Sequence, residues 1–290
     1  MPFCTTDPNL RNDWLTVGSA AQLRGTDSEH PVTTRLLGND LLLWQDADGA
    51  PHCSADGSAM PIRQCYGYLW VLAGDGTAPA LFDLPEYAQP GRRIVDCGGI
   101  GVATSGLRVV ENFLDIGHFP YVHTGTLGKV PHTEVAPYRA QVDPATGEIW
   151  ATDCHFFQPR ASASAADGID AQYQYRVMQP FTAALYKSCP NRDGERDVIC
   201  LFVQPLDEEQ VIAHVLLVYF EDVLSDADMI AFQHMIFGQD KPILESHRPR
   251  RLPLSGPLEA HMRCDLTAAT YRRWLRQRDV RFGVHAPTAA

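Results

Sequence analysis

Residues 138–152 read Tyr138-Arg-Ala-Gln-Val142, Asp143-Pro-Ala-Thr-Gly147 and Glu148-Ile-Trp-Ala-Thr152, and this stretch decides the fold class. The centre contains Pro and Gly and lies between two strand-like segments, which predicts a β-hairpin. Further segments rich in β-branched and aromatic residues continue the series of strands, at residues 171–177, 184–187, 198–204 and 211–220. A long helix is predicted over residues 226–246 and an amphipathic one over 267–278. Strands in series followed by a long helix predict an α+β domain in which an antiparallel sheet closes on that helix.

The sequence before residue 100 predicts a smaller β domain. Residues 34–37 and 41–44 have the pattern of a hairpin, and Tyr66-Gly-Tyr-Leu-Trp-Val-Leu72 reads as a buried strand. The stretch from Gln45 to Met60 is polar and rich in Gly and Ala, and it is predicted to lack strands. Pro and Gly residues punctuate 74–101, so we expect a division into residues 1–100 and 101–290. Residues 161–168 are expected to form a loop.

Composition excludes several classes of protein. The chain has 290 residues, of which 45% are hydrophobic, so it can build a full core. A formal net charge of −11 argues against a nucleic-acid-binding protein, which needs a basic face. No apolar run approaches the roughly 20 residues needed to span a membrane, and the N-terminus does not have the pattern of a signal peptide, so we expect a cytoplasmic protein. The eight cysteines are scattered without a Cys-x-x-Cys pair, which predicts reduced thiols.

The segment Glu111-Asn-Phe-Leu-Asp-Ile-Gly-His-Phe-Pro-Tyr-Val-His123 carries the strongest chemical signal. A helix over residues 107–119 would place Glu111, Asp115 and His118 on one face. A break at Pro120 would turn His123 back toward His118. The pattern suits two neutral imidazoles that meet on one metal ion, with Asp115 close enough to orient one of them.

Two histidines alone favour no particular chemistry, and a pair at this spacing can equally be structural. A carboxylate as the third ligand would complete the facial triad of non-haem Fe(II) oxygenases. Asp240 is the best candidate, because it lies in the long helix next to Pro242, where a local distortion would project its carboxylate. By itself an acidic residue on a helix is more often part of a solvated face.

Two motifs in the expected order carry a family resemblance. The run Glu111-Asn-Phe-Leu-Asp-x-x-His118-x-x-x-x-His123, followed by Thr124-Gly-Thr-Leu-Gly128, resembles the iron-binding signature of Rieske non-haem iron oxygenase catalytic subunits. Phe237-Gly-Gln-Asp-Lys-Pro-Ile-Leu-Glu-Ser246 is similar to the segment that supplies the carboxylate ligand in that family, and the likeness continues through Tyr271-Arg-Arg-Trp-Leu-Arg276. The resemblance implies a helix-grip catalytic domain in which His118, His123 and Asp240 bind a mononuclear Fe(II). It also implies that Asp115 passes electrons to the iron from a Rieske cluster on a neighbouring subunit.

The region where the family holds its [2Fe–2S] cluster departs from the family pattern. Members normally supply a Cys-x-His pair and a Cys-x-x-His pair, whereas this region offers His52, Cys53 and Cys65 in neither spacing. The resemblance therefore implies a truncated N-terminal β domain with no [2Fe–2S] cluster, and within the family it is closest to cluster-less subunits of bacterial methylxanthine N7-demethylases. Electrons would come from a Rieske-containing oxygenase subunit or a Rieske reductase, and indirectly from NADH. The family forms trimers, so a homotrimer or a mixed hexamer is expected.

The resemblance also implies a pocket for a flat substrate. Phe113, Phe119, Ile243 and His247 match positions that line the substrate cavity in related demethylases, with an amide often at the His247 position. The alternative for these apolar residues is ordinary core packing. The arginine-rich stretch of residues 271–281 is expected to be a solvated helix face, with a docking surface as the alternative.

The predicted function is an oxygenase component that hydroxylates an N-methyl heterocycle, which leads to N-demethylation and release of formaldehyde. Hydroxylation of an aromatic ring or O-demethylation would use the same iron site. A second hypothesis is a non-catalytic subunit that stabilises a Rieske-containing partner. A third is a metal-free protein that binds a hydrophobic ligand, which would leave the polar cluster unexplained.

Overall fold

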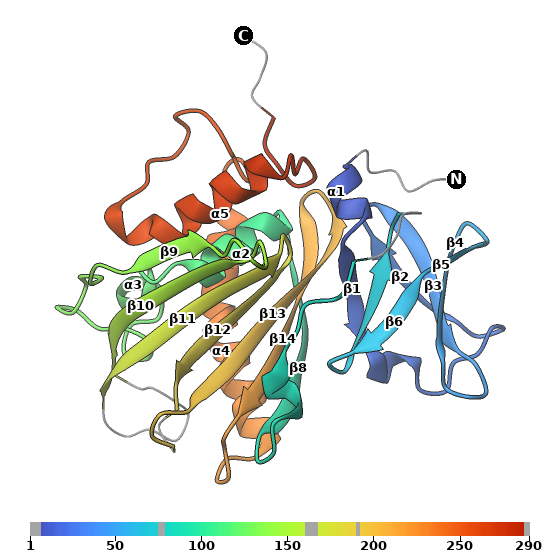
Figure 1. Cartoon of the computed structure of the whole chain (residues 1–290), viewed down its shortest axis with the longest axis horizontal. Coiled ribbons are helices and arrows are strands. Elements are labelled where there is room, and N and C mark those ends of the chain that lie inside the picture. The colour runs from blue at the N-terminus through green and yellow to red at the C-terminus, as the bar shows by residue number, and fades with distance from the viewer. Residues whose placement is uncertain (1–6, 75–78, 160–167, 190–191, 287–290) are drawn as a thin grey trace.

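The computed structural model describes residues 7–74, 79–159, 168–189 and 192–286. Its largest element is a seven-stranded antiparallel sheet in the order β8-β14-β13-β12-β11-β10-β9. The strands are β8 (Arg93–Val102), β9 (Arg139–Val142), β10 (Ile149–Gln158), β11 (Ile169–Gln179), β12 (Thr182–Ser188), β13 (Arg196–Asp207) and β14 (Gln210–Tyr219). The predicted α+β class is confirmed (Figure 1). The loop expected over residues 161–168 lies almost wholly outside the described residues.

The hairpin from which the fold was predicted joins β9 to β10. The Asp143 N–H donates to the Glu148 carbonyl (2.8 Å) and the Gly147 N–H donates to the Asp143 carbonyl (2.8 Å). Gly147 has a φ of +73°, which a residue without Cβ adopts at little cost. The turn residues therefore set this register locally, as the sequence predicts.

Helices cover one face of the large sheet. Helix α4 (Asp226–Ser246) lies behind the sheet in Figure 1, and α5 (Leu266–Gln277) packs beside β9. A capping box starts α4, since Ser225 Oγ accepts from the Asp228 N–H and the Asp228 carboxylate accepts from the Ser225 N–H. The bounds of α4 are those predicted from the sequence. No described helix is long and apolar enough to cross a membrane.

Helix α2 (Gly106–Leu114) is shorter than the predicted helix over residues 107–119, so that prediction is wrong at its C-terminal end. Asp115 caps the helix with an extended ψ of 123°, and its Oδ1 accepts from the Gly117 N–H at 2.7 Å. This local hydrogen bond competes with the next helical turn. Glu111 therefore does not share a helix face with His118, and it bonds to Arg272 instead.

The N-terminal part forms two small sheets. One contains β1 (Trp14–Ser19), β7 (Tyr68–Leu72) and β6 (Ile62–Cys65), and the other β2 (Val32–Leu36), β3 (Asn39–Gln45), β4 (Pro51–Ala55) and β5 (Ser58–Met60). The predicted hairpin of residues 34–44 is confirmed, but the expectation that 45–60 lacks strands is wrong. Contacts with β3 stabilise β4, since His52 pairs with Trp44 across the two strands and their ring centroids stack 5.5 Å apart. A short helix, α1 (Pro8–Arg11), precedes these strands, and 3-10 turns lie at Ala20–Leu23, Pro85–Ala88 and Arg263–Asp265.

The small sheets and the large sheet share hydrogen bonds. The Leu37 and Gly38 N–H groups donate to the Pro205 and Leu206 carbonyls at 2.8 and 2.7 Å. The division expected after residue 100 falls within β8, which pairs with β14 from Arg93 to Val102. The residues just before position 100 therefore belong to the larger sheet, because their backbone hydrogen bonds lie there.

Candidate metal centre

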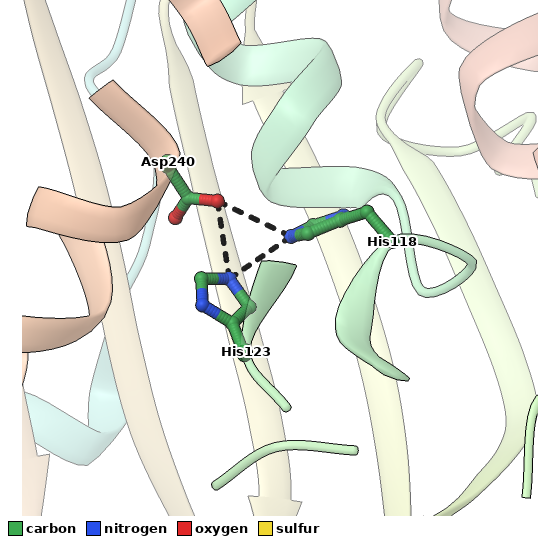
Figure 2. Close-up of side chains that lie close together, drawn as sticks. All are labelled: His118, His123 and Asp240. Carbon is green, nitrogen blue, oxygen red and sulfur yellow. Dashed lines mark hydrogen bonds and ion pairs between the residues drawn. The ribbon is translucent and has the colours of Figure 1, made fainter. Parts of the chain in front are cut away.

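Three side chains from two distant segments converge on one point. His118 Nε2 and His123 Nε2 are 3.1 Å apart, and Asp240 Oδ1 lies 3.3 and 3.1 Å from them. Figure 2 shows the two rings from the segment after α2 facing the carboxylate from α4. Within the described ranges, these residues are the one group of three or more His, Cys, Asp or Glu whose ligand atoms all lie within 4.8 Å of one another.

A single helical turn aims the two histidines at each other. Helix α3 (Phe119–Val122) begins after His118, and its first turn contains Pro120. Proline is favoured there, because the first N–H groups of a helix have no intrahelical acceptor. Pro120 thus starts a helix, whereas the sequence predicted that it would break one. The expected convergence of His123 on His118 nevertheless occurs, since the His123 N–H donates to the Phe119 carbonyl at 3.1 Å and closes the turn.

The loop that follows α3 must pass very close to it. A Cβ on Gly128 would lie 2.5 Å from the Pro120 nitrogen, so only glycine fits this position. The Gly125 N–H donates to the Gly128 carbonyl at 2.8 Å, with a φ of +81° at Gly125. The glycines of Thr124-Gly-Thr-Leu-Gly128 thus let the backbone pack against the turn that holds both histidines.

The outer ring nitrogens fix which nitrogen of each histidine faces inward. His118 Nδ1–H donates to Asp115 Oδ2 (3.1 Å), and His123 Nδ1–H donates to Gln239 Oε1 (2.8 Å). In the neutral form of each ring, Nε2 therefore presents a lone pair toward the other ring and toward Asp240 Oδ1. That oxygen is buried, and no described residue gives it a hydrogen bond of acceptable geometry. Two nitrogen lone pairs and a carboxylate this close need a cation between them, and the donor set fits Fe(II).

The electrostatics of the group point the same way. Burial disfavours the charged form of His118, but the neighbouring carboxylates of Asp115 and Asp240 outweigh it and raise the pKa of His118 to about 9. Burial likewise opposes ionisation of Asp240, yet the adjacent imidazoles of His118 and His123 lower its pKa to about 2. The site therefore keeps its carboxylate ionised and favours positive charge beside it.

Asp115 lies between His118 and the protein surface. Its side chain is 31% exposed, whereas that of His118 is 14% exposed. Gln239 was missed in the sequence, although its position next to Asp240 in α4 is a signal that could have identified it. The Gln239 amide oxygen accepts from His123 Nδ1–H, as the Asp115 carboxylate accepts from His118 Nδ1–H.

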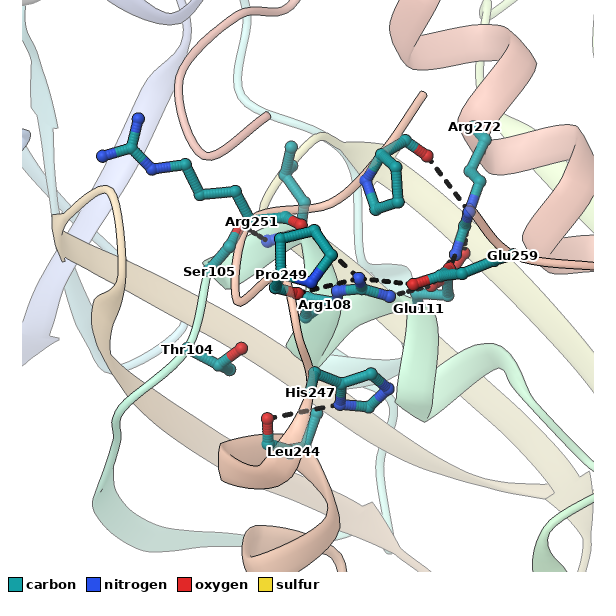
Figure 3. Close-up of polar contacts among 12 residues, drawn as sticks. Thr104, Ser105, Arg108, Glu111, Leu244, His247, Pro249, Arg251, Glu259 and Arg272 are labelled. Carbon is teal, nitrogen blue, oxygen red and sulfur yellow. Dashed lines mark hydrogen bonds and ion pairs between the residues drawn. The ribbon is translucent and has the colours of Figure 1, made fainter. Parts of the chain in front are cut away.

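The candidate centre opens onto an apolar cavity between the sheet and α4. Phe113 and Phe119 line this cavity together with all three converging residues. Ile243 and His247 are not among its described lining residues: Ile243 is 46% exposed, and His247 Nδ1–H donates to the Leu244 carbonyl at the end of α4 (Figure 3). Several polar lining residues carry no signal in the sequence, and these are Gln158, Tyr173, Tyr175 and Lys187 on the sheet and Glu221 just after β14.

Arg272 departs from the expected solvated face of α5. It is buried and makes a bidentate contact with Glu111, and its NH2 group lies 2.5 Å from Glu259 (Figure 3). Arg108 also donates to Glu259, at 2.6 Å. The prediction is wrong for Arg272, because α5 turns this residue toward α2; Arg273 and Arg276 are exposed as expected.

Comparison with known proteins identifies the family. Residues 102–279 match the vanillate O-demethylase oxygenase C-terminal domain. The chain is 44% identical to the probable methylxanthine N7-demethylase NdmC of Pseudomonas sp. (strain TJI-51), over 94% of this chain and 95% of that protein. It is 26% identical to the methylxanthine N1-demethylase NdmA of Pseudomonas putida, over 73% of this chain and 58% of that protein.

Solved structures share the fold at low sequence identity. The structure of Pseudomonas putida CBB5 NdmA with caffeine aligns with a TM-score of 0.76 and 19% identity, covering 93% of this chain and 92% of that one. Dicamba monooxygenase bound to dicamba aligns with a TM-score of 0.73 and 16% identity, covering 93% and 97%. The chain belongs to the Rieske non-haem iron oxygenase family, through the catalytic domain that binds a mononuclear iron in that family.

Proposed function

We propose that the chain is the iron-carrying component of an N-demethylase that acts on an N-methyl heterocycle. The observation that carries this proposal is the convergence of two inward-facing Nε2 atoms and Asp240 Oδ1 at the wall of an apolar cavity. In it, His118, His123 and Asp240 are the iron ligands. The relative with 44% identity is named as a probable methylxanthine N7-demethylase, which supports an N-methyl group on a heterocycle as the site of reaction.

Iron bound at this triad would serve to activate dioxygen, with two electrons supplied from outside the chain. The proposed net reaction consumes the N-methyl compound, dioxygen, two electrons and two protons, and gives the N-hydroxymethyl compound and water. Its C–N bond then breaks and releases formaldehyde and the N–H heterocycle. The contribution of the chain is to hold a flat ring against Phe113 and Phe119 and to exclude water from the cavity.

Asp115 is the proposed entry point for electrons. Its carboxylate accepts from His118 Nδ1–H, and its partial exposure leaves it within reach of a docked protein. In this proposal a Rieske-containing oxygenase subunit or a Rieske reductase docks there, and NADH supplies the electrons through the reductase in the cytoplasm. A trimer or a mixed hexamer would place such a donor beside each iron. The division into an N-terminal β domain and a catalytic domain belongs to the same proposal.

Metal content and turnover, measured separately, test these roles. We expect about one iron per chain after anaerobic Fe(II) reconstitution, and loss of that iron in His118→Ala and Asp240→Ala, since each removes a ligand. Asp115→Ala removes the acceptor of His118 Nδ1–H but none of the ligands, so with Fe(II) in excess it should keep most of the iron and yet produce no formaldehyde with NADH and the donor proteins. Asp48→Ala, an exposed carboxylate in the small β domain, is the control that should leave both readouts unchanged.

Two outcomes would overturn the assignment. Reconstituted protein without iron would favour a non-catalytic subunit that stabilises an oxygenase partner. Normal turnover by Asp115→Ala would remove the electron-bridge role while leaving the iron ligands in place.

A further inference from the structure

Three buried polar atoms on the sheet side of the cavity lack a hydrogen-bond partner among the described residues. They are Gln158 Oε1, Tyr173 OH and Tyr175 OH, on side chains that are 1%, 2% and 1% exposed. All three residues line the cavity that also contains the candidate metal centre. Buried polar groups in native proteins are almost always paired, so three at one cavity need an explanation.

Strand geometry places the two tyrosines side by side. Tyr173 and Tyr175 are two residues apart on β11, so both face the interior, and their rings stack at 6.2 Å. Tyr175 meets the edge of Phe113 at 6.1 Å, and Tyr173 meets Phe119 at 6.3 Å. The two hydroxyl-bearing rings therefore continue the aromatic wall that begins beside His118.

The chemistry of this wall favours hydrogen-bond acceptors. Burial raises the pKa of both tyrosines far above the usual range, so both hydroxyls stay protonated and can donate. Lys187 lies opposite Tyr173 on β12 and also lines the cavity, which adds a nitrogen donor. Gln158 Oε1 is an acceptor at the same wall. A ring edge with carbonyl oxygens and a ring N–H would match this set.

We propose that Tyr173, Tyr175 and Gln158 are specificity-determining residues that hydrogen-bond the polar edge of the substrate and select heterocycles carrying a lactam, C(=O)–N–H. The inference rests on the proposed function for the identity of this cavity as the substrate site. A ring without carbonyl groups would leave the two hydroxyls unpaired, and such a loss discriminates strongly between ligands.

Calorimetric binding to the full-length iron-loaded protein, without reductant, tests the inference with two probes. 7-Methylxanthine carries two carbonyl groups and ring N–H groups, whereas 7-methylpurine has the same ring system without oxygen. We expect the wild type to bind 7-methylxanthine more tightly than 7-methylpurine. Tyr173→Phe and Tyr175→Phe should each raise its Kd about tenfold and leave the Kd of 7-methylpurine unchanged.

A matched pair of tyrosines separates ligand binding from folding. Tyr271 is also fully buried, but its OH donates to the Pro180 carbonyl at 2.6 Å. Without ligand, Tyr271→Phe should lower the Tm, whereas Tyr173→Phe and Tyr175→Phe should not, because they remove hydroxyls that make no hydrogen bond within the described part of the chain. A lowered Tm in the latter two would show that these hydroxyls serve the fold.

The outcomes distinguish the inference from the function on which it rests. If the Phe variants bind 7-methylxanthine as the wild type does, or if the wild type does not prefer it over 7-methylpurine, the inference is wrong even when formaldehyde is produced. If the binding differences appear but no N-methyl heterocycle is demethylated, the proposed function fails and the recognition wall stands.

Discussion

Replacing Arg272 with methionine should strongly destabilise the fold, because Arg272 ties α5 to α2 in the interior. Its guanidinium contacts both Glu111 oxygens, lies 2.5 Å from Glu259 and donates to the Pro253 carbonyl at 3.0 Å. Methionine fills similar space but leaves Arg108 alone to compensate two carboxylates, at 3.7 Å from Glu111 and 2.6 Å from Glu259. The variant therefore holds one uncompensated negative charge in a largely buried site.

The expected cost comes from that charge more than from the lost contacts. Removing one partner of a buried ion pair typically costs 3–5 kcal/mol, and because Arg108 remains we expect the lower end, about 3 kcal/mol. For a chain of this size that corresponds to a fall in Tm of about 6 °C. Urea titration followed by circular dichroism measures the free energy of unfolding directly.

A double variant tests the charge argument. Arg272→Met combined with Glu111→Met leaves Arg108 and Glu259 as a balanced pair, so it should be more stable than Arg272→Met alone. Arg273→Met, an exposed neighbour on α5, is the control and should change stability by less than about 0.5 kcal/mol. If the double variant were as unstable as the sum of the two single variants, packing rather than charge balance would explain the role of Arg272.

Three further predictions follow from the described contacts. Burial lowers the pKa of His214 to about 4, so the stability that neutral His214 contributes is complete above pH 6.5 and is lost as pH falls toward 4. Across that range the free energy of unfolding should fall by up to about 3 kcal/mol more in the wild type than in His214→Asn. Equal pH dependences of the two proteins in urea titrations would contradict this. Gln239→Leu should weaken Fe(II) binding about 10- to 100-fold, because His123 Nδ1–H loses its acceptor. Gln239→Glu keeps an acceptor oxygen, so equal Fe(II) affinities of the two variants in equilibrium dialysis would refute this role. Ser225→Ala should lower the free energy of unfolding by about 1 kcal/mol, because Ser225 Oγ caps the Asp228 N–H at 3.2 Å, and Ser246→Ala in the last turn of α4 should cost less in the same urea titration.

Patterns that act over a few residues were read correctly from the sequence. The β9–β10 turn, strands β9 to β14 and both ends of α4 follow from turn residues, alternation and a cap, whereas β8 lies where the sequence indicated a domain boundary. Contacts made outside the segment itself explain two of the errors. Strand β4 depends on pairing with its neighbour β3, and Arg272 is buried because α5 packs on the distant helix α2. The early end of α2 has a different cause, a hydrogen bond from the Gly117 N–H to the Asp115 side chain that periodicity does not reveal.

By itself the sequence determined the fold class, the family resemblance and the residue types for an iron site. Only the tertiary structure decided that Asp240 faces the two imidazoles, that Gln239 orients His123 and that Tyr173 and Tyr175 are enclosed at the same cavity. The physical reason is that the pattern along a strand assigns each side chain to a face of the sheet. The residues that pack against that face come from α4, in another part of the chain. Hydrogen bonds across such a gap have no local signature in the sequence.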